Sequence, residues 1–117
     1  MEIKQRPQGQ HIFLELWENN ELLGTLDYIP VPPEIQIIDL VIQEQYRQQG
    51  YATKLLQELL YLARTSGCSK IFLEVRVSNL AARNLYNKFD FVETGQRKAY
   101  YQEPTEDAVL MERSLTA

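Results

Sequence analysis

The fold of this chain is decided by residues 34–56, which read EIQIIDLVIQEQYRQQGYATKLL. Residues 34–42 have the apolar content of a strand, residues 43–49 form a polar bend, and Gly50 precedes a helix. The apolar residues of that helix recur every three or four positions: Ala52, Leu55, Leu56, Leu59 and Ala63. Gly67 lies where a helix commonly ends in a left-handed residue. The segment therefore predicts a strand followed by an amphipathic helix.

The apolar pattern of the strand slips by one position at Ile37 and Ile38. A β-bulge near Asp39 would absorb the slip, because a bulge places one extra residue in one strand of a pair. A strand buried on both faces, which Val41 permits, is the alternative. The pattern alone leaves both interpretations open.

The remaining segments complete one α/β (α+β) domain. Strands are expected over residues 12–17, 22–29, 71–77, 91–101 and 108–113, and a second helix over residues 80–89. Pro30, Pro32 and Pro33 predict a loop, because proline cannot continue a ladder. Ser78 and Asn79 are good N-cap residues for the second helix. The order strand, helix, strand predicts a parallel strand pair at the centre.

Composition narrows the function classes. The 117 residues suit one domain, and a single Cys forbids an internal disulfide and a cysteine-based metal site. The formal net charge of −4 argues against nucleic acid as the partner. No apolar run reaches the roughly 18 residues of a membrane span, and residues 1–10 are too polar for a signal peptide. We therefore expect a cytoplasmic protein with no metal and no membrane contact.

The bend before the first helix has the geometry of an anion site. Free backbone N–H groups converge at a helix N-terminus, and the helix dipole favours negative charge there. Residues 47–53, RQQGYAT, occupy this position. Judged by these residues alone, an ordinary loop with a solvated Arg47 is the commoner outcome, and pyrophosphate binding is the alternative.

Two motifs favour pyrophosphate binding over an ordinary loop. Residues 47–52, RQQGYA, are similar to the acetyl-CoA motif of the GNAT superfamily of N-acetyltransferases, Q/R-x-x-G-x-G/A. Residues 73–79, LEVRVSN, followed by AA at 81–82 and LY at 85–86, resemble the signature of RimI-type enzymes, which acetylate the N-terminal alanine of a ribosomal protein. The resemblance covers roughly residues 35–113 and implies a mixed, mostly antiparallel sheet with a splayed central parallel pair and flanking helices.

The resemblance also implies roles for particular residues. Acetyl-CoA would be the cosubstrate. Its pyrophosphate would rest on Arg47, Gln48, Gln49, Gly50, Tyr51, Ala52 and Thr53, and its pantetheine arm on Leu40, Val41, Ile42 and Asn79. A backbone N–H of the strand that holds the pantetheine arm could polarise the thioester carbonyl.

The same resemblance makes Glu74 the general base and Tyr86 the general acid. Tyr100 and Tyr101 would contact the acceptor, a protein or peptide amine. The residues themselves allow plainer interpretations. Glu74 could be a surface carboxylate paired with Arg76, and Tyr86 could be a core aromatic.

The sequence departs from the family at its N-terminal side. The family has a strand and two helices before the hairpin, whereas about ten polar residues precede Ile12 here, so we expect one domain over residues 1–117 without most of those elements. A homodimer could supply the absent wall of the acceptor groove. Asp90 also replaces a usual glycine, which requires a left-handed residue at a cost of about 1 kcal/mol. Two alternatives stay open: acetylation of a small-molecule amine, and a non-catalytic CoA-binding module.

Overall fold

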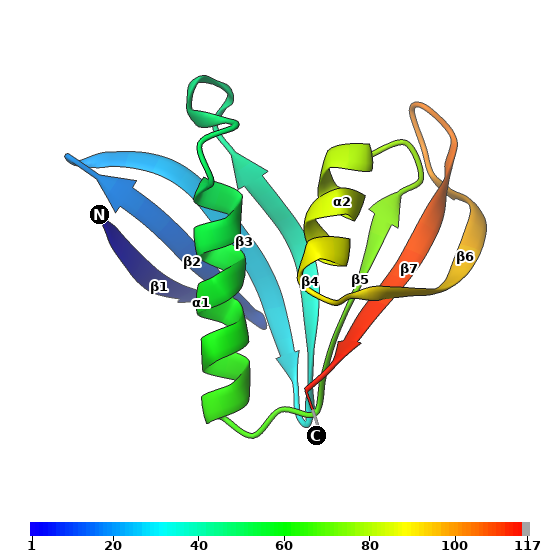
Figure 1. The fold of residues 1–117 in the computed structure, drawn as a ribbon, viewed down its shortest axis with the longest axis horizontal. Coiled ribbons are helices and arrows are strands. Elements are labelled where there is room, and N and C mark those ends of the chain that lie inside the picture. The colour runs from blue at the N-terminus through cyan, green and yellow to red at the C-terminus, as the bar shows by residue number, and fades with distance from the viewer. Residues whose placement is uncertain (116–117) are drawn as a thin grey trace.

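The computed structural model describes residues 1–115. Figure 1 shows a single sheet with helices packed on it. The strands are β1 (Glu2–Gln8), β2 (His11–Glu18), β3 (Glu21–Val31), β4 (Glu34–Ile42), β5 (Lys70–Arg76), β6 (Val92–Tyr101) and β7 (Glu106–Ser114). The helices are a 3₁₀ turn, η1 (Glu44–Tyr46), α1 (Tyr51–Thr65) and α2 (Leu80–Lys88). The strand order is β1-β2-β3-β4-β5-β7-β6.

The only parallel pair in the described sheet joins β4 to β5, and every other neighbouring pair is antiparallel. This confirms the predicted mixed sheet and its central βαβ unit. Both predicted helix boundaries hold: Gly67 takes the left-handed conformation (φ +75°) after α1, and the Asn79 side chain accepts the Ala82 N–H at 3.1 Å to cap α2. Asp90 also adopts the left-handed conformation predicted for it (φ +67°).

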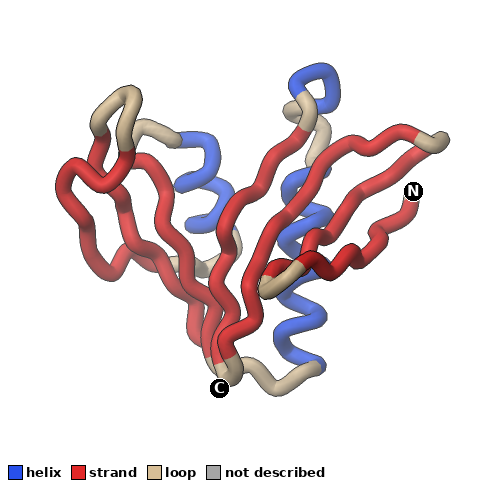
Figure 2. The backbone as a smooth tube through the Cα atoms, turned by 180° about the vertical axis from the view of Figure 1, so that it is seen from behind, coloured by secondary structure: helices blue, strands red, loops and turns tan. Residues whose placement is uncertain are grey.

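Both helices cover the same face of the sheet. In Figure 1 they lie in front of the strands, and from behind, in Figure 2, the strands of the opposite face have no helix over them. The buried residues of α1 are Leu55, Leu56, Leu59, Leu60 and Ala63. On β5 the burial alternates, so that Ile71, Leu73 and Val75 face the core and Phe72, Glu74 and Arg76 face the open side. The core therefore lies between the helices and one face of the sheet.

Two expectations about the N-terminal half are wrong. We expected most of the N-terminal strand to be lacking, yet β1 forms over seven residues and pairs with β2 through the tight turn at residues 9–10, which leaves no room for a helix between them. Strand β3 also runs through Pro30, which pairs with Ile35, so the turn is confined to residues 32–33. The pattern of β1 was not recognised because it has one partly buried apolar residue, Ile3, among polar ones.

Cationic side chains of β1 cover aromatic rings of β2 on the open face. The Lys4 Nζ lies 5.3 Å from the Trp17 ring centroid, and the Arg6 guanidinium lies 4.5 Å from the Phe13 ring. Arg6 also pairs with Glu15 at 2.8 Å, which lowers the pKa of that carboxyl. Because such contacts shield apolar surface while the charges stay in water, they explain how this polar strand is held in the sheet.

Candidate active site

A gap opens in the middle of the sheet between β4 and β5. The two strands pair only from Glu34 to Ile37 on β4 and from Lys70 to Leu73 on β5, and then diverge, as Figures 1 and 2 show. The register with β3 shifts at the same point, because Tyr28 lies opposite Ile37 whereas Asp27 lies opposite Asp39. The extra residue, Ile38, is the bulge, which settles the alternative left open by the sequence.

The bulge turns part of the β4 backbone towards the gap. The Gln43 N–H donates to the Leu23 carbonyl at 2.9 Å, continuing the ladder with β3. Hydrogen-bonded and non-hydrogen-bonded pairs alternate in an antiparallel ladder, so Val41 also bonds to β3, whereas the backbone groups of Leu40 and Ile42 point away from it. Of the three β4 residues expected at the pantetheine arm, two therefore present their backbone to the gap.

Side chains engage both of these exposed backbone positions. The Leu40 N–H donates to Oδ1 of Asp39 at 2.9 Å, and the Ile42 carbonyl accepts from Nε of Arg47 at 3.0 Å. Arg47 is thus bonded to the end of β4 and is not merely solvated. An extended ligand lying along β4 would exchange these side-chain bonds for its own, as an added strand does.

The N-terminus of α1 has free backbone donors. Its first hydrogen bond runs from the Lys54 N–H to the Gly50 carbonyl at 3.2 Å, and no side chain caps the helix. The N–H groups of residues 51–53 have no hydrogen-bond partner within the described residues. Gly50 (φ +84°) and Gln48 (φ +63°) both adopt the left-handed conformation, which turns successive N–H groups to one side. This arrangement suits a pyrophosphate group.

The remaining residues of that motif fit the same use. Gln48, Gln49 and Gly50 are exposed, whereas Ala52 and Thr53 are half-buried in the first turn of α1. Tyr51 packs on the edge of the core. A Cβ on Gly50 would meet no atom within 4 Å, so glycine is needed there for its left-handed backbone and not for space.

Glu74 is the first residue of β5 beyond the paired segment, so it lies where the gap begins. Its side chain is 16% exposed on the open face, and Oε1 lies 3.7 Å from Nε of Arg97. A hydrogen bond to Glu74 and the charge of its carboxylate raise the pKa of Tyr100. Burial and then the Glu74 charge raise the pKa of Tyr101. The structure therefore gathers Glu74, Tyr100 and Tyr101. Arg76 pairs instead with Glu106 at 3.0 Å, so the alternative in which Glu74 pairs with Arg76 is wrong.

Tyr86 approaches from the other face of the sheet. It lies on α2, is 4% exposed and packs against Phe91, with ring centroids 5.3 Å apart. Burial, together with the charge of Asp39, raises the pKa of Tyr86, so the hydroxyl keeps its proton at neutral pH. No contact joins Tyr86 to Glu74 in the part of the chain that is described. The charge of Asp39, which lies on β4 at the gap, acts on the Tyr86 hydroxyl. Tyr86 can therefore be a core aromatic residue and a proton donor at the same time.

Sequence reasoning missed the charge at Asp39. This residue lies opposite Asp27 on β3, and the Asp27 carboxylate bonds to Nδ1 of His11 at 2.7 Å. Like charges directly opposite each other in a sheet repel. Asp39 adds negative charge at the gap, and this charge contributes to the raised pKa of Tyr86. The sequence predicted a bulge near Asp39, and that position was the one signal that pointed to this residue.

Gly24 is a second residue that sequence reasoning missed. A Cβ there would overlap Cδ1 of Ile42 and lie 2.9 Å from the Val41 carbonyl oxygen. Glycine is therefore required for the close approach of β3 to the exposed end of β4. A glycine inside a strand was the available signal.

Two kinds of feature were sought in residues 1–115, metal-binding side-chain clusters and helices able to cross a membrane. No cluster of three or more His, Cys, Asp or Glu side chains is arranged to hold a metal ion there. Neither helix described is both long and apolar enough to cross a membrane.

Comparisons with known proteins agree with this geometry. The family model described as the acetyltransferase (GNAT) family matches residues 2–91. A ribosomal protein bS18-alanine N-acetyltransferase of Haemophilus influenzae is 34% identical over 112 residues, covering 93% of this chain and 76% of that protein. The corresponding Escherichia coli structure has a TM-score of 0.87 at 26% identity and covers 95% of this chain and 73% of its own.

The fold also matches a GNAT family acetyltransferase from Elizabethkingia anophelis with acetyl-CoA bound. The TM-score is 0.83 at 20% identity, covering 91% of this chain and 77% of that one. The match over most of the chain, the relative above 30% identity and the splayed parallel pair lead to one conclusion: the chain belongs to the GNAT family of N-acetyltransferases, whose acyl donor is acetyl-CoA.

Proposed function

We propose that this protein transfers an acetyl group from acetyl-CoA to the N-terminal α-amine of a protein, and that a ribosomal protein is its acceptor. The observation that carries the proposal is the position of Glu74, because this carboxylate lies where β5 leaves β4 and is surrounded by Tyr100, Tyr101 and Arg97. The names of the Haemophilus influenzae and Escherichia coli relatives support the choice of acceptor.

In the proposed reaction Glu74 takes a proton from the acceptor ammonium, directly or through water, and the free amine attacks the thioester carbon. An α-amine has a reference pKa of about 8, against about 10.4 for lysine, so a carboxylate base suffices near neutral pH. As the tetrahedral intermediate collapses, Tyr86 gives its proton to the departing thiolate, and the attacking nitrogen releases its second proton through water, which restores the Tyr86 hydroxyl. A backbone N–H of Leu40 or Ile42 would stabilise the carbonyl oxygen as its negative charge grows.

The acyl donor would use the backbone of the other half of the gap. Residues 47–53 would hold the pyrophosphate through N–H groups, with Arg47 at the rim, and Leu40, Val41 and Ile42 would line the pantetheine arm. Asn79, already bonded to the Ala82 N–H, would contribute its remaining polar atoms to the same arm. Because these donors are fixed before binding, little ordering is needed when acetyl-CoA arrives.

The remaining parts of the proposal concern the whole chain. Residues 1–117 would act as one cytoplasmic domain whose partners are acetyl-CoA and a protein amine, with no nucleic acid and no membrane. A second copy of the chain could complete the open side of the acceptor groove. The alternatives are a small-molecule amine as acceptor and a CoA-binding module without activity.

One experiment separates these functions. The protein is incubated with isotopically labelled acetyl-CoA and a library of peptides with free N-termini and internal lysines, and products are read by mass spectrometry. Label on α-amines supports the proposal. Label on lysine side chains, or on added polyamines only, would assign another acceptor, and tight acetyl-CoA binding by calorimetry with no labelled product would make the chain a binding module.

A further inference from the structure

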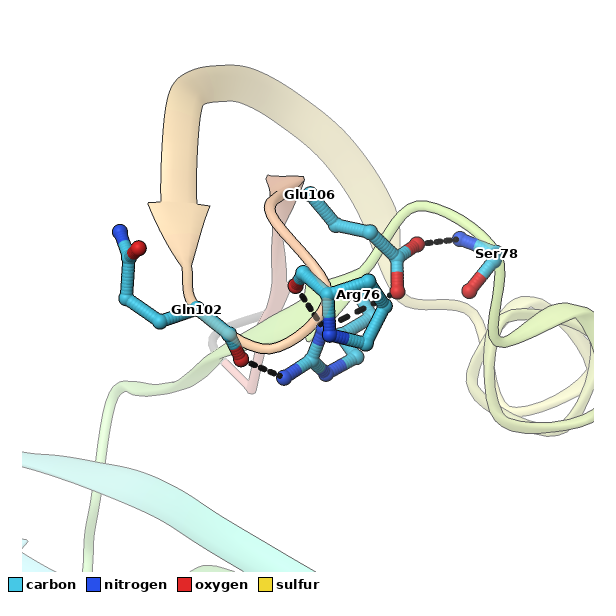
Figure 3. Close-up of polar contacts among 5 residues, drawn as sticks. Arg76, Ser78, Gln102 and Glu106 are labelled. Atoms are coloured by element: carbon cyan, nitrogen blue, oxygen red, sulfur yellow. Dashed lines mark hydrogen bonds and ion pairs between the residues drawn. The ribbon is translucent and has the colours of Figure 1, made fainter.

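The loop between β6 and β7, residues 102–105, is held by one side chain from outside it. Arg76, the last residue of β5, donates from Nη1 to the Pro104 carbonyl at 2.9 Å and from Nη2 to the Gln102 carbonyl at 3.0 Å. Figure 3 shows the guanidinium enclosed by this loop. Its side chain is 32% exposed, so these bonds are partly shielded from water.

The Glu106 carboxylate ties the same loop to the turn before α2. Its Oε2 accepts from Nη1 of Arg76 at 3.0 Å, and its Oε1 accepts the Ser78 N–H at 3.1 Å (Figure 3). The hydrogen bonds from Ser78 and Arg76 lower the pKa of Glu106. Charge-assisted bonds in which both partners are fixed and partly shielded are stronger than exposed ion pairs. Glu106 thus joins the β6–β7 loop to the segment that leads into α2.

The guanidinium also supports the tyrosine pair. It lies 4.6 Å from the Tyr101 ring centroid, and the Tyr101 ring meets the Tyr100 ring edge-on with centroids 5.0 Å apart. Arg97 connects Tyr100 to Glu74, because its guanidinium lies 5.6 Å from the Tyr100 ring centroid and its Nε lies 3.7 Å from Oε1 of Glu74. A continuous chain of contacts therefore runs from Arg76 through both tyrosines to Glu74.

The backbone around the pair is strained. Ala99 and Glu103, one on each side of the pair, both have φ +49°, a region that costs about 1–2 kcal/mol for a residue with a Cβ. Such conformations persist only where the surrounding contacts determine them. The Ala99 N–H bond to Asp107 at 2.9 Å and the Arg76 bonds are the contacts in place.

From these contacts we infer that Arg76 is a positioning residue for the acceptor: it holds the β6–β7 loop so that Tyr100 and Tyr101 stay over Glu74. The inference rests on the proposed function, since Glu74 and the tyrosines form the acceptor side of the gap. Arginine is required because its planar guanidinium donates in several fixed directions while its face stacks on Tyr101. A lysine ammonium keeps the charge but cannot make all of these contacts at once.

Steady-state kinetics with a peptide acceptor test the inference. For Arg76→Gln we expect the acceptor KM to rise about tenfold or more, the loss typical of a hydrogen bond to a charged group, with kcat much less affected. Arg76→Lys should recover only part of the loss. The acetyl-CoA Kd, measured by calorimetry, should change by less than about twofold, since no Arg76 contact lies on the α1 side.

Arg113→Gln is the matched control. Arg113 also donates from Nη1 to a carbonyl, that of Phe89, at 2.9 Å, but it touches no residue of the β6–β7 loop. It should lower stability without raising the acceptor KM. An acceptor KM for Arg76→Gln no higher than that of Arg113→Gln would overturn the inference, as would equal losses in acceptor and acetyl-CoA binding.

A second measurement does not depend on catalysis. Amide hydrogen exchange over residues 99–106 should accelerate in Arg76→Gln and stay unchanged in Arg113→Gln, while the amides of α1 remain protected in both. If the wild-type protein acetylates no amine, the proposed function fails, and exchange still decides whether Arg76 holds the loop. Unchanged exchange in the Arg76→Gln loop would overturn the inference even in an active enzyme.

Discussion

The two sides of the β4–β5 gap offer their ligands different kinds of group. On the α1 side the donors are backbone N–H groups at residues 51–53 and the exposed edge of β4. On the β5 side the polar groups belong to side chains: the Glu74 carboxylate, which accepts, and the hydroxyls of Tyr100 and Tyr101, with Arg76 against the Tyr101 ring. The backbone conformation sets which groups the α1 side presents, whereas the identity of the side chains sets which groups the β5 side presents.

This difference separates what is general in the protein from what is particular to it. In the proposed function the backbone donors would bind a group common to every reaction of the family, the pyrophosphate of the acyl donor, and most side chains there could change without altering the geometry. Side chains on a loop can be replaced one at a time, so the acceptor can change while the donor site is kept. Substitutions on the two sides should therefore have separable effects on turnover and on acetyl-CoA binding.

The largest effect is expected on the side-chain side. Glu74→Gln keeps the size of the residue and removes the proton acceptor, so kcat should fall about a hundredfold, within the range for loss of a general base. The acetyl-CoA Kd should stay near that of the wild type, because the carboxylate makes no contact with α1. Stopped-flow or endpoint assays with a peptide acceptor measure kcat, and calorimetry measures the acetyl-CoA Kd.

Tyr86→Phe is the companion variant for the same prediction. The departing thiol is a good leaving group, with a reference pKa of about 8.5, so protonation helps less than at an alkoxide and the loss should be smaller than for Glu74→Gln. Full activity in both variants would remove the roles given to these side chains and leave the gap without an assigned acid or base.

A smaller effect is expected on the backbone side. Gly50→Ala forces a Cβ into a left-handed position (φ +84°), which costs about 1–2 kcal/mol and distorts the turn that aims the N–H groups. The acetyl-CoA Kd should rise about tenfold, the equivalent of 1.4 kcal/mol. The acceptor KM, measured at saturating acetyl-CoA, should be nearly unchanged.

Gly67→Ala is the control for the stability part of that loss. Gly67 lies at the other end of the same helix with φ +75°, and a Cβ added there would meet no atom within 4 Å, as at Gly50. Both variants should lower the free energy of unfolding by similar amounts, but only Gly50→Ala should weaken acetyl-CoA binding. Equal binding losses would mean that general destabilisation, and not the turn, is responsible.

The contrast between the two sides also explains which parts of the site could be predicted from the sequence. The α1 side could be predicted because strand, glycine and helix periodicity are local patterns, and even the bulge left a mark in the apolar spacing at Ile37 and Ile38. The acceptor side required contacts between β5 and a loop more than 25 residues later in the chain, such as Arg76 with Gln102. No local period predicts such a partner, so the sequence offered only Glu74, two residues away, as a possible partner of Arg76.

The N-terminal strand was missed for a related reason. Only Ile3 of β1 packs against the core, so the strand has almost no apolar alternation of its own. It is held by pairing with β2 and by Lys4 and Arg6 over aromatic rings, contacts that depend on the neighbouring strand. The chain therefore builds a sheet edge from polar residues that show no alternation of apolar and polar positions.

The smallest expected effect concerns the stability of the protein at alkaline pH, to which the buried Tyr86 of α2 contributes. Burial, with the Asp39 charge, raises the pKa of Tyr86 in the folded protein above the value of about 10 for an unfolded chain. Below pH 10 the hydroxyl is protonated in both states and its full contribution to stability is present. Above pH 10 the unfolded chain releases the proton first, so stability is lost as the pH rises through the folded pKa.

Tyr86→Phe removes this proton and should flatten the fall in the free energy of unfolding between pH 9 and pH 11, measured by urea denaturation at each pH. Tyr100→Phe serves as the control, because the pKa of Tyr100 is raised by its hydrogen bond to Glu74 while the residue is 47% exposed, so solvent screens the effect. A flattening as large in Tyr100→Phe as in Tyr86→Phe would contradict the assignment of the effect to burial. In that case ionisation of the exposed Tyr100, and not only of the buried Tyr86, would reduce the stability of the protein at alkaline pH.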